Sequence, residues 1–160
     1  MIQRIQTLFI LLAIAVNIVI FNFDLAAFTY SGNINNFTLL GLIDSNTGTY
    51  LYTNWLIAGL AIATILIGLL AIFLFKKRSL QIKITQLCLF FQTIFVVSIF
   101  YFVDQLQVKL MGSEELAADS LDVSYSSGSL LALIPFVFLF LAIRAISKDE
   151  KLIKAADRLR

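Results

Sequence analysis

The sequence predicts an all-α membrane protein: a four-helix transmembrane bundle with a small extracytoplasmic β-hairpin and a short cytoplasmic C-terminal amphipathic helix. The chain of 160 residues is 60% hydrophobic and only 14% charged, whereas a typical soluble domain is about 25% charged. It also contains four long stretches without Asp, Glu, Lys or Arg, and almost all its basic residues lie on one side of them. This composition excludes a soluble domain, a disordered chain and a nucleic-acid-binding surface.

The four uncharged stretches are the expected transmembrane helices. About 20 helical residues, each rising about 1.5 Å, cross the hydrocarbon core of a bilayer, which is about 30 Å thick. A helix also satisfies its own backbone hydrogen bonds, which lipid cannot do. The stretches are residues 5–23, 55–75, 84–103 and 123–143. The first also resembles a signal peptide, but its apolar run continues past the small-residue site, which favours a retained helix.

The distribution of charge orients these helices. Lys109 is the only basic residue in the two connections 24–54 and 104–122, and the other eleven of the 12 Lys and Arg lie on the opposite side. The positive-inside rule therefore predicts a multi-pass membrane protein with both termini in the cytoplasm. Every Tyr and the only Trp lie at or beyond the outer helix ends, as expected for rings at the headgroup level.

The first outer connection contains the expected β-hairpin. Residues 28–30, 34–43 and 47–52 are rich in β-forming residues, and residues 44–48 have the composition of a turn. An ordered coil is the alternative. In the acidic second connection, residues 113–118 could form one or two helical turns, and its carboxylates lack calcium-loop spacing, so a solvated negative surface is expected.

Most site chemistry is excluded by composition. The chain has no His and a single Cys, Cys88, so imidazole-ligated metal sites and internal disulfides have no residues to form them. No Asp, Glu, Lys, Arg or His lies within the expected spans, which argues against ion-coupled transport. We therefore expect no catalytic, metal-binding or cofactor-binding residues.

The polar and small residues inside the spans are expected to hold the helices together. Small residues let helix backbones approach closely, and amides form hydrogen bonds between helices. A ligand pocket is the alternative for the same residues. The expected packing residues are Asn17, Ala61, Thr64, Gly68, Ala71, Cys88, Gln92 and Ser98.

Pro135 lies near the middle of the fourth span and is expected to kink that helix. Proline has no N–H, so the carbonyl of Leu131 would lose its helical partner. We expect that carbonyl to be satisfied by Gln92, at comparable depth, or by a water.

The C-terminal residues 147–160 are expected to form a separate amphipathic helix. Ser147 and Glu150 have capping-box spacing, so a helix should restart at Ser147. Such a helix could lie on the anionic inner leaflet or dock on a partner; the simpler alternative is a solvated topology determinant. The docking residues would be Lys148, Lys151, Leu152, Ile153, Lys154, Ala156 and Leu159.

The two ends of the chain resemble a known family. Residues 1–7 (MIQRIQT), 143–152 (IRAISKDEKL) and 157–160 (DRLR) are similar to those of small bacterial membrane proteins grouped as domain-of-unknown-function family 4293. The resemblance implies four spans, a bacterial cytoplasmic membrane and a short basic tail. It implies no activity, cofactor or catalytic residue.

These expectations describe a transmembrane unit, residues 1–146, followed by the tail, residues 147–160. The function they favour is that of a non-enzymatic accessory or scaffold protein, which contacts the lipid bilayer and packs with another membrane protein or with itself. The alternative is a carrier or binder of a lipid or apolar small molecule within the helices. An enzyme is the least favoured class, because only outer-loop acids could act.

Overall fold

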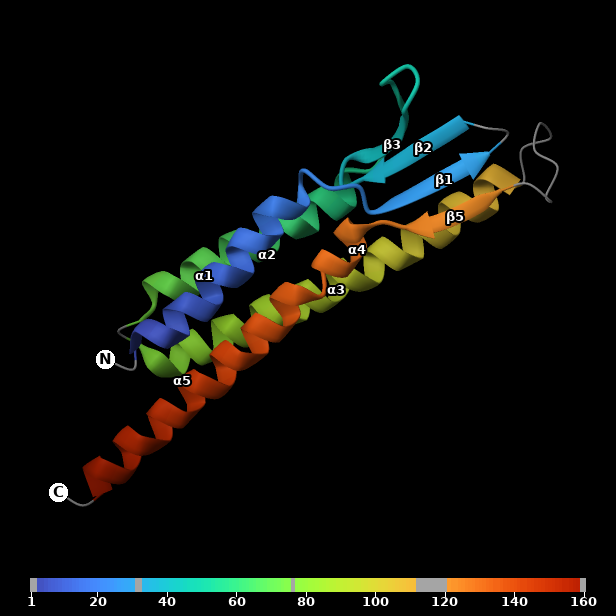
Figure 1. Ribbon diagram of the computed structural model, residues 1–160. Helices are drawn as coiled ribbons and strands as arrows, with labels where there is room; N and C mark the ends of the chain where they lie inside the picture. Colours follow the sequence, from blue (N-terminus) through green and yellow to red (C-terminus); the bar gives the residue numbers. More distant parts are fainter. Residues whose placement is uncertain (1–2, 31–32, 76, 112–120, 159–160) are drawn as a thin grey trace.

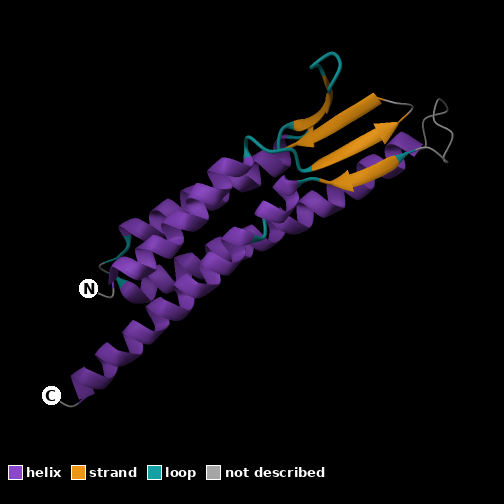
Figure 2. Ribbon diagram, in the orientation of Figure 1, coloured by secondary structure: helices purple, strands orange, loops and turns teal. Residues whose placement is uncertain are grey.

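The computed structural model describes residues 3–30, 33–75, 77–111 and 121–158. Four long helices pack together, and a five-stranded antiparallel sheet lies at one end of them (Figure 1). Figure 2 shows that the strands gather at that end only. The protein is therefore an α+β fold, and the prediction of an all-α four-helix bundle carrying one small hairpin was wrong.

The helices pack in a ring. Helix α1 (Gln3–Ile20) lies against α2 (Trp55–Phe73) and α5 (Ile134–Arg158), and α3 (Arg78–Met111) also lies against both α2 and α5. A short helix, α4 (Ser127–Leu131), precedes α5. Each helix thus has two long neighbours, which bury the side chains that face the centre of the ring.

Three helical segments are long and apolar enough to cross a membrane: Trp55–Phe73, Arg78–Met111 and Ser127–Leu152. The apolar part of α1, Ile5–Ile20, is shorter. It ends before the expected residue 23 because the chain turns there toward the sheet, with the N–H of Phe21 donating to the carbonyl of Ile18. Helix α3 extends beyond the expected span at both ends, because charged and polar residues end an apolar stretch without ending a helix.

The sheet combines both outer connections in the order β4-β3-β2-β1-β5. Its strands are β1 (Ala26–Tyr30), β2 (Asn33–Thr38), β3 (Gly41–Asp44), β4 (Tyr50–Thr53) and β5 (Asp122–Tyr125). Sequence reasoning missed β5, whose apolar and aromatic residues were assigned to the start of the fourth span. The helical turns expected at residues 113–118 lie outside the described residues.

One face of the sheet packs on the outer part of α3. Alternate residues of a strand point to opposite faces, and the buried set includes Phe28, Phe37 and Leu42. These three share one hydrophobic core with Val103 and Leu106 of α3. The extension of α3 beyond the apolar stretch is therefore the support on which the sheet rests (Figure 1).

Asp44 shapes the turn between β3 and β4. Its carboxylate accepts hydrogen bonds from the backbone N–H of Asn46 and the hydroxyl of Thr47, both at 2.9 Å. These bonds, the backbone one first, hold the pKa of Asp44 below its ordinary value of 3.8. A lowered pKa means that the ionised carboxylate supports the turn above the ordinary value, and that this support is lost as the pH falls through the lowered one.

Gly41 permits the close approach of β3 and β4. Its φ is +146°, and a Cβ added there would lie 2.0 Å from the carbonyl oxygen of Tyr52. No side chain fits at that distance, so any other residue would push the two strands apart.

We expect Gly41→Ala to lower the free energy of unfolding by about 1–3 kcal/mol, the usual cost of a strained backbone position. Thermal unfolding in detergent measures this. Gly59→Ala is the matched control, because a Cβ there has nothing within 4 Å. An unchanged unfolding midpoint for Gly41→Ala would contradict this account of the β3–β4 contact.

Candidate functional site

A chain of side-chain amides connects three helical segments inside the helix ring. The Nδ2 of Asn17 in α1 donates to the Oε1 of Gln92 in α3 at 2.9 Å. The Nε2 of Gln92 then donates to the carbonyl of Ala132, between α4 and α5, at 3.0 Å. Gln92 is 0% exposed and Asn17 is 3% exposed, so this link is shielded from both water and lipid.

Helix α2 joins the same region through Thr64. Its hydroxyl lies 3.5 Å from the Nδ2 of Asn17 and donates to the carbonyl of Ala61 at 2.7 Å. The thiol of Cys88 in α3 donates to the carbonyl of Thr64 at 3.4 Å. All four helical segments therefore meet around one polar cluster, defined here as Asn17, Thr64, Cys88, Gln92 and the Ala132 carbonyl.

The small residues of α2 are buried on the same helix as Thr64. Ala61, Gly68 and Ala71 are all buried, and a Cβ added to Gly68 would lie 3.0 Å from Cγ1 of Ile14. Close approach of α1 and α2 thus depends on Gly68. Ser98, the remaining residue expected to pack between helices, is half-buried on α3.

The fourth helical segment is interrupted just before Pro135. Helix α4 ends at Leu131 and α5 begins at Ile134, which leaves Pro135 in the first turn of α5. Proline costs little there, because first-turn N–H groups have no helical partner. Gln92 consequently bonds the carbonyl of Ala132, one residue beyond the expected Leu131.

A second buried polar contact joins α1 to α5 at the opposite end from the sheet. The Nε2 of Gln6 donates to Oδ2 of Asp149 and, at 3.3 Å, to the carbonyl of Ala145. Both side chains are buried, Asp149 to 7% exposure. Sequence reasoning missed this pair, although Asp149 continues the apolar stripe of Leu139, Ala142 and Ile146 on α5.

The buried Asp149 also explains why no separate tail helix forms. Helix α5 runs unbroken to Arg158, so the expected restart at Ser147 was wrong. No glycine or proline interrupts residues 144–158, and the helix must continue through residue 149 to bring that carboxylate to Gln6. Of the expected docking residues, Lys148, Lys151 and Leu152 are exposed. Ile153, Lys154 and Ala156 belong to α5, and Leu159 lies outside the described residues.

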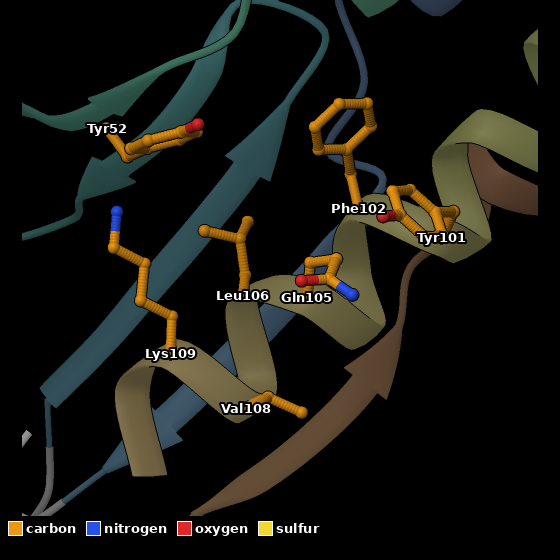
Figure 3. A pocket seen from close by; sticks show the side chains of 7 residues that line it. All are labelled: Tyr52, Tyr101, Phe102, Gln105, Leu106, Val108 and Lys109. Carbon is orange, nitrogen blue, oxygen red and sulfur yellow. The ribbon is translucent and has the colours of Figure 1, made fainter. Parts of the chain in front are cut away.

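An open groove lies between the outer part of α3 and the edge strand β4 (Figure 3). Its volume is about 390 Å³. The Nζ of Lys109 lies 4.6 Å from the ring centroid of Tyr52, a cation–π distance. Sequence reasoning missed this groove, and the available signal was Lys109 itself, the single basic residue of the outer connections. The lining residues are Tyr52, Tyr101, Phe102, Gln105, Leu106, Val108 and Lys109.

The polar cluster is suited to holding helices together. Its amide and hydroxyl groups are not ionisable, and both ends of the Gln92 amide are bonded within the protein. The Oδ1 of Asn17 accepts no hydrogen bond from the described residues. Within those residues, no group of three or more His, Cys, Asp or Glu could hold a metal ion.

These features define a class of protein: helices of membrane-spanning length, joined by buried amides, that carry a small antiparallel sheet at one end. The chain belongs to the family DUF4293, described as a domain of unknown function, whose model matches residues 2–159. The family suspected from the two termini is thereby confirmed. A comparison with curated proteins finds no match to this chain.

The bond between Asn17 and Gln92 can be measured by a double-mutant cycle. We expect Asn17→Ala and Gln92→Ala to show a coupling energy of about 0.6–1.7 kcal/mol, between the average and the largest value for hydrogen bonds between membrane helices. Equilibrium unfolding in lipid–detergent bicelles measures it. The control pairs Asn17→Ala with Thr93→Ala, because exposed Thr93 donates within its own helix, to the carbonyl of Leu89. Additive effects in the first cycle would disprove the link.

Proposed function

We propose that this protein is a non-enzymatic accessory protein of the bacterial inner membrane, which binds another membrane protein or a second copy of itself. In this proposal the chain crosses the bilayer four times, with both termini in the cytoplasm and the sheet outside. The observation that carries it is that the buried polar groups form hydrogen bonds within the protein. We therefore assign binding to the surfaces at the two ends of the molecule.

Four crossings are supported by the ring arrangement of the helices. Helix α1 lies side by side with α2 and α5, both of which belong to segments long enough to cross a membrane. Its outward side chains include Leu8, Leu11 and Ile18, each 52% exposed. An apolar surface of this kind is suited to lipid and not to water.

The orientation is supported by charge and aromatic residues. Lys77 and Arg78 lie at the end of the helices away from the sheet, and the exposed Tyr50, Trp55 and Tyr125 lie at the sheet end. Basic residues favour the cytoplasmic side, and Tyr and Trp favour the headgroup level. Both tendencies favour a periplasmic sheet.

The free end of α5 is the proposed partner-binding element. Figure 1 shows the last turns of α5 extending past the start of α1. Leu152 is 55% exposed there, next to exposed Lys151. An apolar residue beside basic ones on a projecting helix is typical of a helix that docks on a protein groove or on an anionic membrane surface.

The carrier alternative has less support. It requires polar groups free to contact a solute between the helices, and Gln92 is one of the residues for which a ligand pocket was the alternative. Both ends of its amide bond to Asn17 and Ala132 instead. A solute would therefore have to break existing hydrogen bonds before it could form its own.

Orientation can be tested by cysteine labelling in a Cys88→Ser background. We expect Ser124→Cys on β5 to react with a membrane-impermeant maleimide in intact spheroplasts, because the sheet is periplasmic. Lys77→Cys should react only in inside-out vesicles. Both positions are exposed, so access to the reagent depends on the side of the membrane. Labelling of Lys77→Cys in intact spheroplasts would overturn the orientation and the role of α5 together.

Partner binding can be tested by removing residues 152–160. This truncation keeps Asp149 and its bond to Gln6, so we expect an unchanged unfolding midpoint together with the loss of most of the crosslinked partner or dimer. Crosslinking before mild-detergent purification measures the recovery. Lys83→Gln, which changes an exposed basic residue elsewhere, is the control. Full recovery of the crosslinked species from the truncated protein would exclude the end of α5 as the docking element.

A further inference from the structure

The groove between α3 and β4 has the features of a phosphate-binding site at the membrane surface. We propose that it binds the phosphodiester headgroup of a phospholipid in the outer leaflet, with Lys109 as the anion-binding residue. The position of the groove relative to the membrane is deduced from the proposed four-crossing orientation, so this inference rests on that proposal. Its chemistry rests on the groove itself.

The depth of the groove follows from the length of α3. Residues 84–103 are uncharged and, at about 1.5 Å per residue, span about 30 Å, the full hydrocarbon core. The groove begins at Tyr101 and ends at Lys109, so it extends about 12 Å along the helix. It therefore starts at the edge of the hydrocarbon and passes through the headgroup layer, which is about 5–8 Å thick on each side.

The charge of the groove selects an anion. Lys109 is the single basic residue of the two outer connections, and it forms no ion pair with any residue that the structure describes. Its ammonium lies against the ring of Tyr52, an interaction that does not neutralise the positive charge. An anion that approaches the acidic outer surface would find its favourable contact here.

The walls of the groove suit a lipid more than a free anion. Two neighbouring stripes of α3 line it: Tyr101, Gln105 and Val108 form one, and Phe102, Leu106 and Lys109 form the other. Both stripes follow the helix axis, with i, i+4, i+7 spacing. In Figure 3 the Lys109 amine points to Tyr52 at one end, and Tyr101 and Phe102 lie at the other. Apolar walls beside a single cation match a glycerophosphate joined to its acyl chains.

The surface of α3 continues from the groove toward the hydrocarbon. Val97 is 60% exposed, Tyr101 is 58% exposed and Val108 is 61% exposed, and these residues follow one side of the helix at i, i+4 and i+11. An acyl chain could lie along Val97 while the phosphate contacts Lys109. A soluble anion would gain nothing from this apolar continuation.

Native mass spectrometry of the delipidated protein tests the proposal. We expect one dioctanoyl-phosphatidylglycerol to bind saturably to the wild type. Lys109→Gln should weaken its binding about fivefold, because one Lys near an anionic lipid surface contributes that factor, and Lys109→Arg should retain it. Lys77→Gln, an exposed basic residue away from the groove, should bind as the wild type does.

Equal binding by Lys109→Gln would overturn the proposal. So would equal binding of dioctanoylglycerol, which lacks the phosphate, because the groove would then select only the acyl chains. Displacement of the lipid by millimolar inorganic phosphate would show a free-anion site and would also overturn it. Because the measurement is made in detergent, a failure here is distinct from failure of the membrane orientation, which the labelling of Ser124→Cys reports.

Discussion

The hydrogen bond from Gln92 to the carbonyl of Ala132 is the interaction on which the helical part depends. The fourth helical segment is interrupted at residues 132–133, and an interruption leaves backbone carbonyls without helical partners. Lipid offers no donor to replace them. Gln92 supplies one and accepts a hydrogen bond from Asn17 in turn, so a local defect of one helix becomes a link among three helical segments.

Helix α3 extends this organisation to the sheet. Gln92 lies on its inner part, and Val103 and Leu106 lie on the outer part that supports Phe28 and Phe37. One continuous helix therefore carries the polar link between the helices, part of the core under the sheet and one wall of the groove that contains Lys109. The chain passes from the edge strand β5 through α4 and then enters the helix ring as α5. The interruption between α4 and α5 is compatible with this path.

The sequence predicted the features that depend on composition along the chain. The apolar stretches, the strand-forming character of the first outer connection and the family could be recognised from their own residues. The pairing of β5 with β1 could not, because it depends on two connections meeting in space. Asp149 shows the same limit: the neighbouring Ser147 and Glu150 indicated a capping box, whereas the hydrogen-bond partner of Asp149, Gln6, is 143 residues away. The sequence shows Lys109 as an isolated charge, but its contact with Tyr52 depends on how the sheet places β4 beside α3.

Solid-state NMR of the protein in lipid bilayers, with labelled asparagine and glutamine side chains, tests the central link most directly. A through-space contact between the Asn17 and Gln92 side-chain amides, lost in Gln92→Leu but retained in Thr93→Val, is the predicted result. Rapid exchange of the Gln92 side-chain protons with solvent, or no contact with Asn17, would show that the helices are held together in another way.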